Sequence, residues 1–147
     1  MLDNLKKGRE EGAQIATGGK QLHSQGFENE HFIEPTILTN CADSTRVTRE
    51  EIFGPGMSVL IFDDEQDAIE RANSSEFGLG AGVIKTDLSR THHVADAPIS
   101  GNIWFNSVNI LPLGLPFGRA KRPGFGRENS ICTLNACSEL KSVHITL

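Results

Sequence analysis

Met57-Ser58-Val59-Leu60-Ile61-Phe62 begins a series of alternating elements that extends to residue 106. This apolar run has the length of a strand. Asp63 follows it as the predicted N-cap of a helix, and Gln66 three residues later completes a capping-box pattern. The apolar stripe of that helix is expected to be buried and comprises Ala68, Ile69 and Ala72.

Two further strand-like segments follow this helix. Leu79–Ile84 predicts a second strand, in which Gly80 and Gly82 indicate close packing against the backbone. Asp87 is the predicted N-cap of a second helix, and residues 102–106 predict a third strand. The order strand, helix, strand, helix, strand predicts an α/β fold with a parallel sheet and flanking helices.

The segments before this series are also predicted to be ordered. Met1–Ala16 predicts a helix that is ended by Gly18 and Gly19. One face of that helix would carry Leu2, Leu5, Ala13 and Ala16. Phe32–Leu38 predicts an extended segment, with Pro35 at an edge or a bend.

Beyond residue 106 the regular pattern stops. Residues 107–127 are rich in proline and glycine and predict a long loop, which in a compact domain is usually functional or packed against another element. A short helix is expected near residues 129–138. Lys141–Leu147 alternates polar and apolar residues, which predicts a terminal strand that needs a partner in the sheet or in another subunit.

Composition excludes several classes of protein. The 147 residues carry 14 Lys and Arg against 19 Asp and Glu, a net charge of −5, which argues against a nucleic-acid partner. We expect no membrane partner, since no apolar run reaches the length of a membrane span. Three cysteines and an N-terminus without the apolar region of a secretory signal predict a cytoplasmic location.

The sequence predicts no catalytic residue and no metal ligand within this chain. The glycine-rich runs at 78–82 and 124–126 lack the third glycine of a dinucleotide-binding loop, so packing is the better interpretation. Cys132 lies between Ile131 and Thr133 and is interpreted as a buried structural thiol. No cysteine has a further ligand at metal-binding spacing.

Two polar segments remain open to more than one interpretation. Glu50-Glu51-Ile52-Phe53-Gly54-Pro55 is either a solvated acidic pair before a strand or a ribose-binding carboxylate beside an aromatic ring. Pro116–Glu128 contains four cations, which can bind an anion or pair with carboxylates such as Glu50 or Glu128.

Five ordered motifs resemble the NAD(P)-dependent aldehyde dehydrogenase superfamily over essentially the whole chain. Residues 50–55 resemble its E-E-I-F-G-P signature, and residues 116–128 resemble P-F-G-G-x-K-x-S-G-x-G-R-E. The other motifs are Phe32–Thr36 for F-x-x-P-T, Ala72–Leu79 for A-N-x-x-x-Y/F-G-L and Gly101–Asn106 for G-x-x-x-x-N. Arg127-Glu128-Asn129 and the terminal strand most resemble the betaine aldehyde dehydrogenase branch.

This resemblance implies that the chain is the C-terminal part of such an enzyme. Residues 1–137 would belong to its catalytic domain, and residues 138–147 would form an oligomerisation strand that makes a homo-oligomer. The cofactor domain, the general base and the nucleophilic cysteine have no counterpart here, so the isolated chain is expected to be inactive. In the whole enzyme, an aldehyde would be oxidised to its acid through a cysteine thioester, with NAD or NADP as cofactor.

The resemblance also implies roles for individual residues. Glu51 matches the residue that binds the nicotinamide ribose, and Phe53 matches the aromatic residue beside it. The substrate-lining positions are Ser107, Val108, Leu111 and Phe117. Val108 and Leu111 are aliphatic where relatives that recognise trimethylammonium groups carry aromatic rings, so the aldehyde stays open. A non-catalytic binding or assembly module that retains the fold is the alternative.

Overall fold

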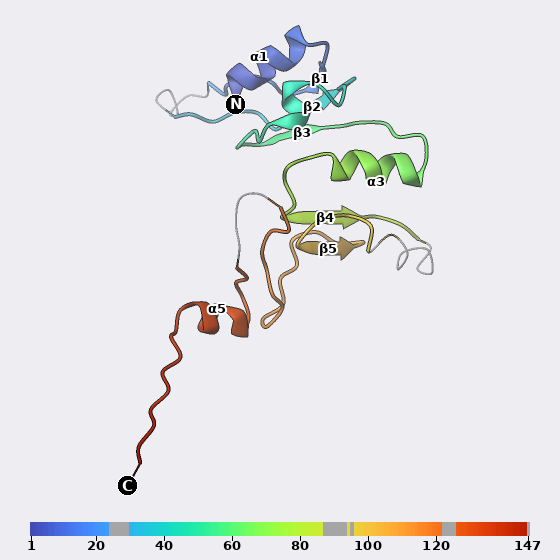
Figure 1. Ribbon diagram of the computed structural model, residues 1–147. Helices are drawn as coiled ribbons and strands as arrows, with labels where there is room; N and C mark the ends of the chain where they lie inside the picture. The colour runs from blue at the N-terminus through green and yellow to red at the C-terminus, as the bar shows by residue number, and fades with distance from the viewer. Residues whose placement is uncertain (24–29, 87–93, 95, 122–125, 147) are drawn as a thin grey trace. The chain divides into compact units, whose positions relative to one another are not determined.

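The computed structural model describes residues 1–23, 30–86, 94, 96–121 and 126–146. These residues form two compact units, Met1–Glu65 and Gln66–Leu147. Each unit contains one small sheet with helices, drawn in Figure 1.

The first unit holds a three-stranded mixed sheet and two helices. In chain order its elements are α1 (Leu2–Glu10), β1 (Gln14–Thr17), β2 (Thr36–Thr39), α2 (Arg46–Arg49) and β3 (Gly56–Ser58). The strand order is β1-β2-β3, with β1 antiparallel and β3 parallel to β2. The core of the unit comprises Leu5, Ala13, Leu38 and Val47.

The predicted helix over residues 1–16 is too long. The helix ends at Glu10, and Gly12 turns the chain with a φ of 104°, a conformation that favours glycine. Residues 14–17 then pair with β2, because the antiparallel ladder satisfies their backbone groups after this turn. Ala13 reaches the core, whereas Ala16 is exposed on β1.

The predicted extended segment Phe32–Leu38 is confirmed in its second half, where residues 36–38 belong to β2. β2 begins directly after Pro35, whose missing N–H is tolerated at a strand end. Gly18 is required beside it: with a φ of 71°, a Cβ there would lie 2.2 Å from the carbonyl oxygen of Pro35. The two glycines therefore end a strand and not a helix.

The second unit confirms two of the three predicted strands. β4 (Gly80–Val83) and β5 (Asn102–Phe105) pair in parallel, with Gly82 opposite Trp104. The unit also contains most of α3 (Glu65–Asn73) and all of α5 (Ile131–Ala136).

The prediction of one parallel sheet over residues 57–106 is wrong in its first strand. β3 covers only Gly56–Ser58 and pairs in parallel with β2, whose other neighbour is β1. Ile61 and Phe62 are exposed and lie outside any strand. In the described part of the chain, two small sheets therefore replace the single sheet.

The helix after this run is confirmed as α3, but its details differ from the prediction. The amide of Gln66 donates to Oε1 of Glu70 at 2.7 Å, and the capping box of Asp63 and Gln66 stays a prediction. Ala68 and Ile69 are only half-buried and Ala72 is exposed, because the described residues place no tightly packed layer over this helix. The helix predicted from Asp87 lies outside the described residues.

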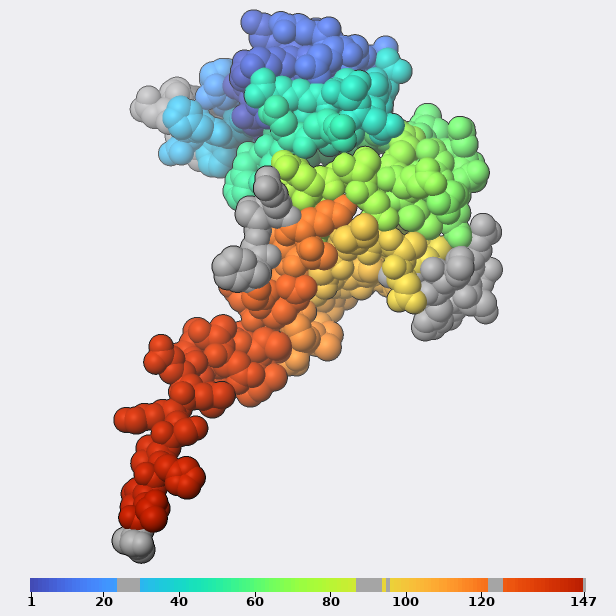
Figure 2. All heavy atoms as spheres, in the orientation of Figure 1, coloured from blue at the N-terminus to red at the C-terminus, as the bar shows by residue number. Residues whose placement is uncertain are grey.

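The C-terminal region is confirmed in part. Residues 107–121 are irregular, and α5 forms with Ser130 as its N-cap, whose Oγ accepts from the N–H of Cys132 at 3.2 Å. Residues 138–146 have no regular secondary structure, so the terminal strand stays a prediction. Figure 2 shows their side chains (red) uncovered, and Val143 and Ile145 are exposed. Within the described residues, we find no helix long and apolar enough to cross a membrane.

Candidate functional site

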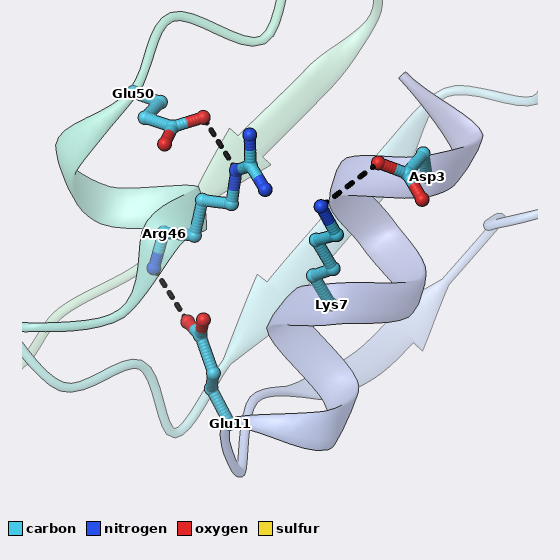
Figure 3. Close-up of polar contacts among 5 residues, drawn as sticks. All are labelled: Asp3, Lys7, Glu11, Arg46 and Glu50. Carbon is cyan, nitrogen blue, oxygen red and sulfur yellow. Dashed lines mark hydrogen bonds and ion pairs between the residues drawn. The ribbon is translucent and has the colours of Figure 1, made fainter.

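Glu50 is held by an ion pair at the end of α2. Nε of Arg46 lies 2.5 Å from Oε2 of Glu50, and the backbone N–H of Arg46 donates to Oε2 of Glu11 at 2.6 Å (Figure 3). The Glu50 carboxylate, through this hydrogen bond and its charge, raises the pKa of the Arg46 guanidinium. The first glutamate of the acidic pair therefore has a structural partner in the helix that it caps.

Ile52 orients the two residues that flank it. The chain leaves α2 in an extended conformation, with ψ of 150° at Glu50, and Ile52 packs against the core of the first unit. Successive side chains of an extended segment point to opposite sides, so Glu51 and Phe53 lie on the side away from the core. Both are exposed, and Phe53 is 91% exposed.

The turn after Phe53 is built into the same unit. Gly54 has a φ of 155°, and a Cβ on it would lie 2.7 Å from Sδ of Met1. The carbonyl of Pro55 accepts from the N–H of Thr36 at 2.8 Å, directly before β2 and β3 pair. The sheet therefore anchors the segment that carries Glu51 and Phe53.

Glu51 and Phe53 have the chemistry that a nucleotide cofactor requires. Among the described residues, no hydrogen bond or ion pair involves the Glu51 carboxylate, which leaves its oxygens available to ribose hydroxyl donors. The exposed phenyl ring offers an apolar face for a heterocycle. These two residues are therefore the candidate contacts for the ribose end of a dinucleotide.

The second candidate surface is the loop that follows β5. The indole N–H of Trp104 donates to the carbonyl of Ile110 at 2.8 Å. The amide of Asn102 donates to the carbonyl of Pro116 at 3.1 Å and accepts from the N–H of Gly118 at 3.2 Å. Asn102 and Trp104 are two residues apart on one strand, so the same face of β5 holds both ends of the loop.

A further asparagine holds the middle of this loop. Nδ2 of Asn129 donates to the carbonyls of Pro112 at 2.8 Å and Leu115 at 3.3 Å. Its own carbonyl accepts from the N–H of Gly114 at 3.0 Å. The segment before α5 therefore closes the turn at residues 112–115.

The four predicted substrate-lining residues all lie on this loop. Ser107 is half-buried, with its hydroxyl donating to the carbonyl of Phe105 at 3.2 Å, and Phe117 is half-buried in a backbone bridge with Glu128. Val108 and Leu111 are 61% and 45% exposed. Glu51 and Phe53 belong to the other unit.

One cation of the segment Pro116–Glu128 has a structural role that the sequence did not indicate. Nζ of Lys121 donates to the carbonyls of Asn73 at 2.8 Å and Ser75 at 2.9 Å. A lysine at the C-terminal end of a helix satisfies the last carbonyls and complements the helix dipole. Arg127 donates to the carbonyl of Gly126, and Arg122 lies outside the described residues. Glu50 pairs with Arg46 and with none of the described cations of this segment.

The cysteines do not form a reactive cluster. Cys132 is half-buried, so its interpretation as a buried thiol is wrong: its helix, α5, has no buried residue. Cys41 is also half-buried, and burial raises the pKa of its thiol although hydrogen bonds to Ser58 and Val59 oppose this effect. The described residues contain no group of three or more His, Cys, Asp or Glu arranged to hold a metal ion.

Comparison with known proteins identifies the family. Residues 1–143 match the aldehyde dehydrogenase family. The chain belongs to this family. Betaine aldehyde dehydrogenase of Brucella ovis is 48% identical over all 147 residues of this chain, which span 30% of that relative. The corresponding proteins of Brucella canis and Brucella suis show the same identity and coverage.

Solved structures of this family have the same fold. A structure of the Bacillus cereus aldehyde dehydrogenase, described as its NAD+ complex, matches with a TM-score of 0.88 and 39% identity. The match covers 97% of this chain and 28% of that one. Betaine aldehyde dehydrogenase of Staphylococcus aureus in complex with NAD+ matches with a TM-score of 0.86 and 34% identity, over 92% of this chain and 28% of that one. The α/β fold of this aldehyde dehydrogenase chain is thereby confirmed, over less than a third of its relatives' length.

In this aldehyde dehydrogenase chain, the sequence indicated neither the three residues that hold the loop after β5 nor the lysine that binds the end of α3. Asn102, Trp104, Asn129 and Lys121 all contact backbone carbonyls of segments at least six residues away. The signal available for the loop was its proline content, because a proline-rich loop has few N–H groups of its own and needs donors from elsewhere. The partner carbonyls themselves cannot be identified from spacing.

Proposed function

We propose that the protein carrying this chain is an NAD(P)-dependent aldehyde dehydrogenase that oxidises an aldehyde to its carboxylic acid. The observation that carries the proposal is 48% identity over the whole chain to betaine aldehyde dehydrogenases. In the proposed reaction a cysteine thiolate adds to the aldehyde carbon, a hydride leaves that carbon, and water cleaves the resulting thioester to acid and thiol. The nicotinamide cofactor supplies the hydride acceptor.

The nucleophile is not assigned to this chain. The thiol of Cys41 is half-buried with a raised pKa, which disfavours the thiolate that attacks a carbonyl. Cys132 and Cys137 belong to the short helix α5 and its cap, outside both candidate surfaces. We therefore expect the 147-residue chain alone to be inactive.

We assign cofactor binding to Glu51 and Phe53. The Glu51 carboxylate would accept hydrogen bonds from the nicotinamide ribose, and the Phe53 ring would pack beside it. This assignment is supported by the packing of Ile52 against the core, which leaves both flanking side chains exposed on one side of the segment.

We assign substrate lining to Ser107, Val108, Leu111 and Phe117. Three of these four side chains are apolar, so the loop suits the carbon chain of a small aldehyde. Betaine aldehyde is the first substrate to test, because the relatives at 48% identity carry that name. Phe117 is the aromatic ring among the four that can face its trimethylammonium group.

Residues 138–147 are proposed to form an oligomerisation strand, with residues 1–137 belonging to the catalytic domain. Val143 and Ile145 alternate with polar residues and are exposed, so in a strand paired with the edge of another subunit's sheet they would form one apolar face that packs against that subunit. The partner would be a second copy of the same protein.

The decisive experiment follows cofactor reduction by the intact protein with betaine aldehyde and with a series of aliphatic aldehydes. We expect aldehyde-dependent formation of NADH or NADPH by the intact protein and none by the 147-residue chain alone. Cofactor reduction by the isolated chain above a boiled control would contradict the proposal that the nucleophile lies outside these 147 residues. An intact protein that binds cofactor but reduces none with any aldehyde would favour the non-catalytic module.

A further inference from the structure

The loop after β5 is held at three separate places. Trp104 binds it at Ile110, and Asn102 binds it at Pro116 and Gly118, both from β5. The third anchor is Asn129, which comes from the segment before α5 and binds the turn at residues 112–115. The first two anchors hold the ends of the loop, and the third holds its tip.

The tip of the loop is short of backbone donors. Pro112 and Pro116 lack an N–H, so the turn contributes few donors. One bond within it, from the N–H of Leu115 to the carbonyl of Pro112, is 3.3 Å long. The Asn129 amide binds the carbonyls of both of these residues, at 2.8 and 3.3 Å. Asn129 therefore supplies donors that the loop lacks.

The backbone of Asn129 is adapted to this task. Its φ is 61°, in the left-handed region where asparagine is enriched among residues other than glycine. In this conformation its carbonyl accepts from the N–H of Gly114 while its side chain reaches the opposite carbonyls. One residue thus bonds the turn through both its main chain and its side chain.

The residues on either side of this clamp are proposed substrate-lining positions. Leu111 directly precedes Pro112, and Phe117 is bonded through both backbone groups to Glu128, the residue before Asn129. These two bonds, from each N–H to the other carbonyl, are 3.0 and 2.8 Å long. A shift of Asn129 would therefore be transmitted to both side chains.

We propose that Asn129 is a positioning residue that sets the aldehyde preference of the enzyme by fixing the turn between Leu111 and Phe117. The proposal rests on the proposed function of this loop in substrate binding. Asn129 acts through the loop, so its amide determines where the two apolar side chains lie and which carbon chain fits beside them.

The test is Asn129→Gly in the intact protein. Glycine adopts the positive φ without strain and keeps the carbonyl that binds Gly114, so only the amide bonds are lost. We expect KM for a longer aliphatic aldehyde and for betaine aldehyde to change by different factors. The ratio of their kcat/KM values should shift at least fivefold, and KM for the cofactor should stay within twofold. Hydrogen exchange at Gly114 and Leu115 should be faster.

Asn40→Gly is the matched control. Asn40 also has a positive φ, 53°, and its amide donates to the carbonyl of Gly12 at 3.1 Å, but it belongs to the first unit. Its replacement should leave the aldehyde ratio unchanged. Asn129→Asp is a second variant that keeps the side-chain size while replacing the amide donors with a carboxylate, and it should shift the ratio in the same way.

The outcomes separate this proposal from the one on which it rests. An active enzyme whose aldehyde ratio stays within twofold in both Asn129 variants would overturn the role of Asn129 and leave the proposed function intact. An equal shift in Asn40→Gly would overturn it as well. If the wild-type protein oxidises no aldehyde, the proposed function and the role of Asn129 in aldehyde preference are both wrong. Hydrogen exchange at Gly114 and Leu115 still shows whether the Asn129 amide holds the turn.

Discussion

Gly80 lies directly against the indole ring of Trp104: a Cβ built on Gly80 would be 2.6 Å from Cζ3 of that ring. The two residues are on the paired strands β4 and β5, where Gly82 is opposite Trp104 and Gly80 is its diagonal neighbour. The absence of a side chain at Gly80 lets the ring lie against the backbone of β4. From there its N–H reaches the carbonyl of Ile110 and anchors the candidate substrate loop.

Gly80→Ala is expected to destabilise the second unit, because the new methyl group must displace the Trp104 ring. Overpacking of this kind costs roughly 1–3 kcal/mol. Urea unfolding followed by tryptophan fluorescence measures the loss. Gly82→Ala is the control on the same strand, since its Cβ would lie 3.3 Å from the exposed Val108 side chain, which can move. Equal unfolding midpoints for the two variants would contradict the steric argument.

Lys121→Met is expected to destabilise the junction after α3. The variant keeps most of the side chain but removes the charged donor that binds the carbonyls of Asn73 and Ser75. Hydrogen bonds from charged groups contribute about 1.5–3 kcal/mol, so the free energy of unfolding should fall by an amount in that range. Lys6→Met, at an exposed position of α1, is the control and should change it by less than about 0.5 kcal/mol.

The acidic pair after α2 allows a test with neighbouring residues. Glu51→Gln in the intact protein should raise KM for the cofactor roughly 10-fold or more, because a charge-assisted hydrogen bond to the ribose is lost. Glu50→Gln should leave that KM unchanged, since Glu50 is paired with Arg46. Steady-state and single-turnover kinetics measure both. Unchanged hydride-transfer kinetics in Glu51→Gln would show that this carboxylate does not hold the ribose.

The Cys41 thiol is expected to make the folded chain less stable at alkaline pH. Burial raises the pKa of its thiol in the folded state, so the folded chain binds this proton more tightly than the unfolded chain. The stabilising contribution of the protonated Cys41 thiol is complete below the ordinary thiol pKa of about 8.5. It is lost as pH rises through the pKa of the folded state. Urea unfolding from neutral to alkaline pH should show a steeper decline for wild type than for Cys41→Ala. Cys137→Ala, at an exposed thiol, should follow the wild type.

The alternation at residues 141–147 allows a test of assembly. Replacing Val143 and Ile145 together with Asp should lower the mass of the intact protein to that of a monomer, because charges would disrupt the apolar face of the proposed strand. Ser142→Asp lies at an intervening polar position and should leave the assembly intact. Size-exclusion chromatography with light scattering distinguishes these results. An oligomer that survives the double replacement must be held together elsewhere.

Sequence alone was sufficient for the two strands of the second unit. β4 and β5 lie where the apolar segments at 79–84 and 102–106 predicted them, and Gly80 has the close packing contact that its position in a strand indicated. These features depend on local periodicity and on the small size of glycine, and both can be recognised from the amino-acid sequence. The five motifs in order also predicted the family that the comparisons confirmed.

Other features depended on contacts between distant segments. Met57 pairs in β3 with β2 and not with β4, because a strand's partner is chosen by backbone hydrogen bonding that its own composition does not encode. Glu50 and Glu51 are neighbouring residues of the same type. Glu50 forms an ion pair with Arg46, whereas the packing of Ile52 leaves Glu51 exposed. Asn129 and Lys121 are ordinary polar residues until folding brings carbonyls of residues 112, 115, 73 and 75 within reach. Motif and periodicity thus specified the family and strands β4 and β5, and long-range hydrogen bonding and packing decided which side chains hold the loop after β5 and which face outward.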